Sequence, residues 1–200
     1  MKTFTTFLTE QKNLHLEHLE DELFNRGDAG VKEAINFITA LTDMLQGESK
    51  KAVDVTVKWD GAPAVFAGIN PENGKFFVAT KSLFNKTPKI NYTDEDIEAN
   101  HSGGLVDKLK IALSQLSKLN IQGVLQGDML FTNDVSTTNI DGKSYRAFTP
   151  NTITYAVPSD SDLAKVIDKA KLGIVFHTTY TGNTIADLKA SFGADVSGLK

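Results

Sequence analysis

Apolar residues in the first fifty positions recur at the three- and four-residue spacing that is typical of amphipathic helices. Gly27 interrupts this repeat and Asp28 can cap a new helix, so two helices are predicted, and Gly47 ends the second. We expect them to form a helical hairpin, residues 1–48, that packs on the rest of the chain. Their apolar stripes are Leu16, Leu19, Leu23 and Phe24 on the first helix and Val31, Ile35, Ile38, Leu41 and Leu45 on the second.

The period of the apolar positions changes from Ala52 onward, where alternating apolar and polar residues predict strands. Turn sequences over 60–63 and 70–75 separate the first three strands, which indicates an antiparallel meander. Strands are expected over 52–59, 64–69, 75–80, 123–132, 152–158 and 172–182, and helices after Thr93, over 104–120, over 161–170 and from Ile185 onward. The predicted class is therefore α+β, with residues 49–200 forming a mostly antiparallel core.

Composition narrows the classes of protein and of site that this chain can represent. The 200 residues suit one domain with a small appendage. The absence of cysteine excludes disulfides, thiolate metal sites and cysteine nucleophiles, and it agrees with a reducing cytoplasm. Because no apolar run reaches the roughly 20 residues that span a bilayer, no membrane partner is expected.

Charge is distributed unevenly along the chain, whose formal net charge is −4. The first fifty residues are mainly acidic, whereas the segment from Asn73 to Thr93 contains no acid. The lysines of this segment are Lys75, Lys81, Lys86 and Lys89. The segment is either a groove for a nucleic-acid backbone, whose binding would weaken steeply with salt, or ordinary solvated surface.

A lysine at the end of an apolar strand is the main candidate for chemistry. Lys58 precedes Trp59, the only tryptophan, and the turn residues Asp60 and Gly61. A lysine amine attacks only when it is unprotonated, a form that desolvation beside apolar side chains favours. The glycine turn would let backbone approach a phosphate. The alternative is an ordinary strand-to-turn junction with Lys58 on its wet face.

Lys58-Trp59-Asp60-Gly61 resembles the K-x-D-G signature of covalent nucleotidyltransferases, the superfamily of DNA ligases, RNA ligases and mRNA capping enzymes. The resemblance implies that Lys58 attacks the α-phosphorus of ATP, with GTP or NAD as alternatives, in the presence of Mg²⁺. It implies DNA or RNA ends as partners. Lys58 and Asp60 would be catalytic residues, and Lys58 and Gly61 would contact the nucleotide.

Three later segments are similar to further motifs of that superfamily and follow in its order, so the resemblance covers about residues 52 to 182. In "VLQGDMLF", Asp128 would hold the ribose or the metal. In "LGIVFHTTY", Phe176 would stack on the nucleobase. In "FVATKSLFNK", Lys81 and Ser82 would contact the nucleotide or the substrate end.

The chain also departs from the superfamily pattern. Asp128 stands where the family has glutamate, and no glutamate follows Glu98, so the family's Glu-Gly motif IV is missing. The Lys-x-Lys of motif V is missing as well. The sequence is then either a fragment of a longer protein or a degenerate relative. As a whole it resembles proteins of large tailed bacteriophages, which implies the cytoplasm of a host cell.

Alternative interpretations remain open beside the enzyme. The chain is an enzyme that forms a lysyl-nucleotide on Lys58, a nucleotide- or nucleic-acid-binding module without turnover, or a phage structural or host-interaction protein. His15 and His18 are either metal ligands or part of a solvated helix face. His177 should point to the opposite face of its strand from Phe176, and a surface or hydrogen-bonded core position is its default interpretation.

Overall fold

The computed structural model describes residues 19–47 and 58–199. The chain divides into two units, Met1–Lys58 and Trp59–Lys200, and each is described by itself. The strand expected over 52–59 is not seen at its end, because Lys58 and Trp59 have irregular backbone, and residues 52–57 lie outside the described residues. No helix of the described ranges is both long and apolar enough to cross a membrane.

The described part of the first unit, α2 (Asp21–Leu45), consists of two helical segments that meet at a kink at Gly27. The predicted break at Gly27 is confirmed, because Gly27 has φ 55° and ψ −134°, a conformation that side chains disfavour. Arg26 bridges the bend, where its guanidinium donates to both carboxylate oxygens of Glu33. The bend therefore has a local cause in both backbone and side chains.

Most of the described residues of the predicted apolar stripes are exposed on α2. Phe24 is 72% exposed and Leu45 is 73% exposed. Leu23, Ile35 and Ile38 are exposed as well. The helical hairpin and its packing on the core stay predictions, because residues 1–18 lie outside the described ranges and the two units are not placed relative to each other.

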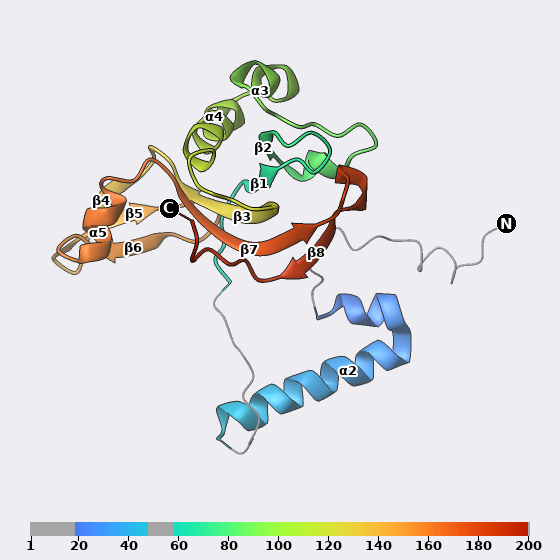
Figure 1. The fold of residues 1–200 in the computed structure, drawn as a ribbon. Coiled ribbons are helices and arrows are strands. Elements are labelled where there is room, and N and C mark those ends of the chain that lie inside the picture. Colours follow the sequence, from blue (N-terminus) through green and yellow to red (C-terminus); the bar gives the residue numbers. More distant parts are fainter. Residues whose placement is uncertain (1–18, 48–57, 200) are drawn as a thin grey trace. The chain divides into compact units, whose positions relative to one another are not determined.

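Five strands form the main sheet of the second unit, in the order β2-β1-β3-β7-β8, and every neighbouring pair is antiparallel (Figure 1). They are β1 (Ala64–Ile69), β2 (Phe76–Ala79), β3 (Val124–Phe131), β7 (Gly173–Thr181) and β8 (Lys189–Phe192). The strands predicted over 64–69, 75–80, 123–132 and 172–182 are thus confirmed. The prediction that helices accompany mostly antiparallel strands is confirmed.

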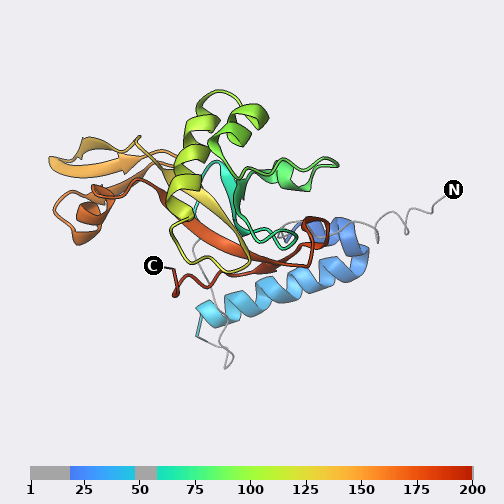
Figure 2. The same ribbon diagram turned by 45° about the horizontal axis from the view of Figure 1, so that its top comes forward.

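Two helices cover one face of this sheet (Figures 1 and 2). Thr93 caps α3 (Asp94–Asn100) in a reciprocal capping box with Asp96, as the sequence predicts for a helix after Thr93. The longer helix α4 (Gly104–Leu116) buries Leu109, Ala112 and Leu116 against β1 and β3 residues that include Val65, Leu125 and Met129. The side chains at odd-numbered positions of β1 and β3 therefore form the core beneath α4.

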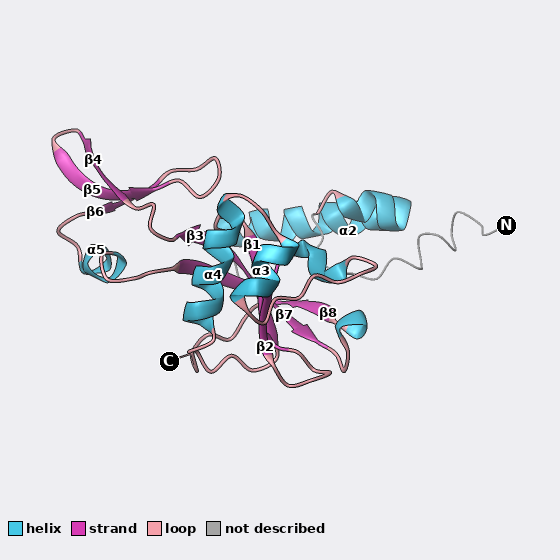
Figure 3. Ribbon diagram, turned by 90° about the horizontal axis from the view of Figure 1, so that it is seen from above, coloured by secondary structure: helices cyan, strands magenta, loops and turns pink. Residues whose placement is uncertain are grey.

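A smaller sheet and a short helix lie to one side of the main sheet (Figure 3). The strand order is β4-β5-β6, made by β4 (Ser136–Ile140), β5 (Lys143–Phe148) and β6 (Tyr155–Pro158), followed by α5 (Asp162–Ile167). The hairpin of β4 and β5 was not predicted, although Asp141-Gly142 is a turn signal that follows the β-branched segment Ser136–Ile140. Ser161 caps α5 as its sequence suggests.

The prediction of a helix from Ile185 onward is wrong. Only a 3₁₀ turn, η2 (Ile185–Asp187), forms there, and the chain then enters β8. Ile185 and Leu188 are buried in the core on the face away from α4, and β8 pairs with β7 from Thr179↔Ser191 to Thr181↔Lys189. Pairing with an available sheet edge outweighs the local helical pattern in so short a segment.

His101 makes the stability of the second unit depend on pH. Burial and the nearby charge of Lys89 lower its pKa below the ordinary value of 6.5. The folded state therefore disfavours protonation, so this contribution to stability is complete above about pH 6.5 and is lost as the pH falls through the folded-state pKa. Urea unfolding of the wild type and of His101→Gln should show that only the wild type loses this contribution between about pH 7 and pH 5. A constant difference between the two proteins would contradict this assignment.

Candidate functional site

The residues after Lys58 are attached directly to the main sheet. The Ala62 N–H donates to the carbonyl oxygen of Met129 at 2.9 Å, and the Met129 N–H donates to that of Pro63 at 3.1 Å. These bonds extend the β1–β3 pairing, in which Ala64 is opposite Asp128, beyond the start of β1. Both Lys58 and Trp59 are exposed. The turn predicted from Asp60-Gly61 is thus placed beside β3.

Gly61 lies in direct contact with Asp128, which is also a predicted site residue. A Cβ atom at Gly61 would lie 2.8 Å from the Cβ of Asp128 and 2.7 Å from the carbonyl oxygen of Met129. No side chain fits at that distance, so glycine is required here by close approach. Two segments predicted separately from the sequence, Asp60-Gly61 and Gly127-Asp128, are brought together.

The carboxylate of Asp60 is held by a distant loop, and no sequence pattern connects the two. Asn151 Nδ2 donates to both carboxylate oxygens, at 3.1 and 3.3 Å, and Thr152 Oγ1 donates to one of them at 3.1 Å. The Asp60 N–H donates to the Tyr155 hydroxyl at 2.7 Å. These contacts give Asp60 a role in positioning the turn, in addition to any role in chemistry.

Replacing Asp60 with alanine is expected to lower the free energy of unfolding by about 1 kcal/mol, because hydrogen bonds from Asn151 and Thr152 are lost. Asn151→Ala should reproduce part of this loss. The exposed Asp160, for which the described residues show no hydrogen bond, is the matched control, and Asp160→Ala should change little. Urea denaturation measures all three, and an Asp60→Ala protein as stable as the wild type would exclude the positioning role.

A row of aromatic rings runs from the core to the turn. Phe131 and Phe148, both 5% exposed, have ring centroids 4.9 Å apart. Phe148 stacks on Tyr155 at 5.5 Å, and Tyr155 contacts Trp59 at 5.1 Å with an interplanar angle of 38°. The row ends at Trp59, so the smaller sheet supports the segment that follows Lys58.

Asp128 shares one face of the main sheet with His177. Leu125 and Met129 belong to the core beneath α4, so strand alternation directs Asp128 to the opposite face. Its Oδ1 atom lies 3.6 Å from Nε2 of His177, which sits at a register shift between β3 and β7. His177 Nδ1 is 2.8 Å from Thr178 Oγ1. The Asp128 side chain is 16% exposed and that of His177 is 30% exposed, whereas Nε2 of His177 is itself buried and has no hydrogen-bond partner among the described residues.

Phe176, the predicted base-stacking residue, lies on the other face of the sheet from Asp128. It packs against the core beneath α4. A Cβ atom at Gly127 would meet the Phe176 ring at 2.9 Å, so the ring covers this glycine. The structure therefore does not bring Phe176 together with Asp128 and Gly61, and His177 takes the corresponding place on the Asp128 face.

Lys81 and Ser82 begin the 3₁₀ helix η1 (Lys81–Phe84), which follows β2. Because Ala79 is opposite Phe66 in the register, the chain enters η1 at the end of the sheet where β1 begins. Ser82 Oγ is 2.9 Å from Thr80 Oγ1, so this hydroxyl supports the turn. Lys81 is exposed.

The four lysines of the segment without acids have different surroundings. Lys75 lies over the Tyr92 ring at 5.9 Å, and Lys89 Nζ donates to the Asn100 carbonyl at 2.9 Å. Lys81 and Lys86 are exposed, and none of the ion pairs of the described residues includes them. These two therefore have charges available for a phosphate.

The fit of the predicted Mg²⁺ depends on Asp128. Within residues 19–47 and 58–199, no cluster of three or more His, Cys, Asp or Glu side chains could hold a metal ion by itself. Mg²⁺ commonly binds through one or two carboxylates, with waters and substrate phosphates as its other ligands. Asp128 fits that donor set as a single protein ligand. His15 and His18 lie outside the described residues.

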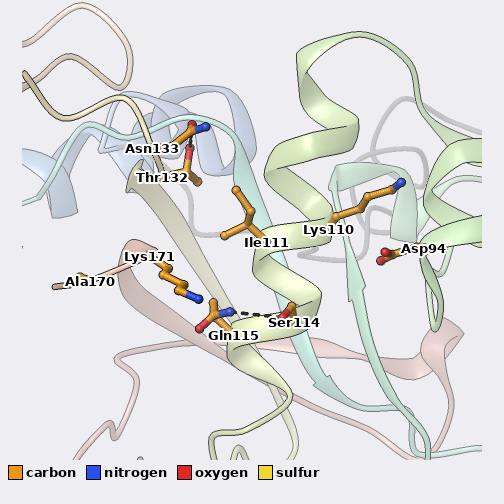
Figure 4. Close-up of a pocket in the computed structure, with 9 residues that line it drawn as sticks. All are labelled: Asp94, Lys110, Ile111, Ser114, Gln115, Thr132, Asn133, Ala170 and Lys171. Carbon is orange, nitrogen blue, oxygen red and sulfur yellow. Dashed lines mark hydrogen bonds between the residues drawn. The ribbon is translucent and has the colours of Figure 1, made fainter.

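A cavity of about 520 Å³ lies elsewhere on the second unit (Figure 4). Ile111, Ser114 and Gln115 of α4 form one wall, and Thr132 with Asn133 forms another (Figure 4). The remaining lining residues are Asp94, Lys110, Ala170 and Lys171. None of the residues predicted from the sequence for the nucleotide site lines it.

Comparison with known proteins identifies a family but does not assign an activity. No curated protein matches the chain, and no solved structure matches it. One family model matches residues 13–200, and the chain therefore belongs to that family, a family of unknown function (DUF6267).

Proposed function

We propose that this chain is a ligase-type nucleotidyltransferase that forms a lysyl-nucleotide on Lys58 and acts on nucleic-acid ends. The observation that carries the proposal is the direct contact between Gly61 and Asp128. A Cβ atom built on Gly61 would lie 2.8 Å from the Cβ of Asp128. This contact joins the turn after Lys58 to the strand that bears the acid of the second motif. Both segments were identified from the sequence, and neither pattern by itself requires the contact.

The proposed chemistry has two transfers. The unprotonated Nζ of Lys58 attacks the α-phosphorus of ATP, a P–N bond forms, and the bond to the bridging oxygen breaks with its electron pair going to pyrophosphate. The proton of the amine passes to water. A terminal phosphate oxygen of DNA or RNA then attacks the same phosphorus, the P–N bond breaks, and Lys58 takes up a proton. GTP is an alternative donor that also releases pyrophosphate, and NAD is one that would release nicotinamide mononucleotide instead.

The other residues of the site have supporting roles in this proposal. Asp128 would hold Mg²⁺, which supplies charge neutralisation for the phosphates, or would bond to the ribose. Asp60 positions the turn through Asn151 and Thr152. Lys81 and Lys86 offer charge to the phosphates of a nucleic-acid end, so binding of that end should weaken with salt. We assign the activity to the cytoplasm. For a protein encoded by a phage, this is the cytoplasm of the bacterial host.

Exchange of labelled pyrophosphate into ATP tests the first transfer without requiring a nucleic-acid substrate. Because the first transfer is reversible, the wild type should exchange the label when ATP and Mg²⁺ are both present. The reaction should stop when either one is omitted. Absence of pyrophosphate exchange into both ATP and GTP, together with absence of exchange of labelled nicotinamide mononucleotide into NAD, would contradict the proposed enzyme.

A second candidate function is a nucleotide-binding module without turnover. This candidate is favoured by the absence of any glutamate after Glu98. The chain therefore lacks the Glu-Gly motif IV of the covalent nucleotidyltransferases. This candidate predicts saturable binding of ATP with no exchange of pyrophosphate. The two functions are therefore separated by calorimetric titration and the exchange assay on one sample.

A further inference from the structure

Trp59 presents an aromatic surface at the proposed site. It is the only tryptophan of the chain and is 39% exposed. One side of its ring lies against Tyr155, with the centroids 5.1 Å apart. The part of the ring that Tyr155 does not cover is therefore available to a flat ligand.

The Tyr155 ring against which Trp59 lies is itself held in place on its other sides. Tyr155 accepts a hydrogen bond from the Asp60 N–H at 2.7 Å, and its hydroxyl lies 3.2 Å from the Asp60 carbonyl oxygen. Phe148 stacks on the far side of Tyr155 at 5.5 Å and is itself 5% exposed. Less side-chain freedom is then lost when a ligand stacks on Trp59, and this favours binding.

The base of the nucleotide needs an aromatic partner that Phe176 does not offer on the Asp128 face, since Phe176 packs beneath α4. A single ribose separates the base from the α-phosphate, so the base must lie within about one side-chain length of the attacking amine. Trp59 is the residue next to Lys58 in the chain. We propose that Trp59 is the platform on which the base of the bound nucleotide stacks, an inference that rests on the proposed function.

This placement has a consequence for selectivity. Stacking on an aromatic ring is tolerant of base identity, because every base has a π face. Trp59 should therefore contribute affinity for ATP and GTP alike, and the choice between them must come from hydrogen bonds at the edge of the base. Inorganic tripolyphosphate, which has no base, should gain nothing from Trp59.

Fluorescence of the single tryptophan tests the inference directly on the full chain. The probe is α,β-methylene-ATP with Mg²⁺, whose carbon bridge prevents pyrophosphate from leaving, so that only reversible binding is observed. It should quench Trp59 saturably, whereas tripolyphosphate should not. By calorimetry, Trp59→Ala should bind the probe roughly 5- to 100-fold more weakly, and Trp59→Phe should stay close to the wild type.

The matched control is Phe192→Ala, which removes an aromatic ring that is 69% exposed on β8 and should leave affinity unchanged. Equal affinity of Trp59→Ala and wild type for the probe would overturn the inference, as would equal quenching by tripolyphosphate. If a single-stranded oligonucleotide quenched the fluorescence of Trp59 and the probe did not, the inference would be overturned. Trp59 would then contact the nucleic-acid strand instead of the base of the nucleotide. Unimpaired pyrophosphate exchange by Trp59→Ala at low ATP would overturn it while leaving the proposed function intact.

Discussion

Replacing Lys58 with alanine is expected to abolish covalent labelling of the protein by ATP that carries label on its α-phosphate. The expected loss is complete, because the amine of Lys58 is the atom that forms the bond to phosphorus in the proposed reaction. Lys58→Arg should also fail to become labelled, since a guanidinium keeps the charge but remains protonated and does not act as a nucleophile. The pair of variants therefore separates nucleophilic chemistry from electrostatic attraction of the nucleotide.

The control for this prediction is Lys118→Ala. Lys118 is exposed beyond the end of α4, and the proposed site does not include it, so labelling should be unchanged. Denaturing electrophoresis after incubation with labelled ATP and Mg²⁺ gives the readout. Labelling of Lys58→Ala at the wild-type level would assign the nucleophile to another residue and would contradict the account.

Replacing Gly61 with alanine should have the second largest effect. The new Cβ would lie 2.7 Å from the carbonyl oxygen of Met129 and 2.8 Å from the Cβ of Asp128, so the turn must move away from β3. Overpacking of this kind costs about 1–3 kcal/mol of stability. Because a displacement of about 1 Å can reduce a reaction rate about 100-fold, adduct formation should slow by at least that factor.

Gly104→Ala is the matched control for Gly61→Ala. Nothing lies within 4 Å of a Cβ at Gly104, and this glycine starts α4, so alanine should be tolerated there. Urea denaturation gives the change in stability, and the time course of labelling gives the rate. If Gly61→Ala matched the wild type in both measurements, the contact between the turn and Asp128 would have no part in function.

The strands and helices with strong local patterns were predictable from the sequence. β1, β3 and β7 are apolar segments bounded by turn residues, and α4 carries a regular apolar stripe. β8 was missed because its four residues pair with β7 only through tertiary contact, which overrides a weak helical pattern. The β4–β5 hairpin had a local signal in Asp141-Gly142, and attention to that turn would have found it.

The candidate site was less predictable, because its contacts join distant segments. The sequence identified Asp60, Gly61 and Asp128, but nothing in it reports that Asn151, 91 positions later, holds Asp60. The faces of Phe176 and His177 depend on how β7 sits against β3, including a register shift beside Gln126 and Gly127. Such a shift depends on pairing with another strand, so periodicity within β7 does not reveal it.

The mass of the intact wild-type protein after incubation with ATP, GTP or NAD, each with Mg²⁺, shows whether a nucleotide becomes covalently attached. We expect a mass gain of one nucleoside monophosphate, greatest with ATP, and peptide mapping should locate it at Lys58. A protein whose mass stays unchanged with all three donors would contradict the claim that Lys58 forms a covalent intermediate.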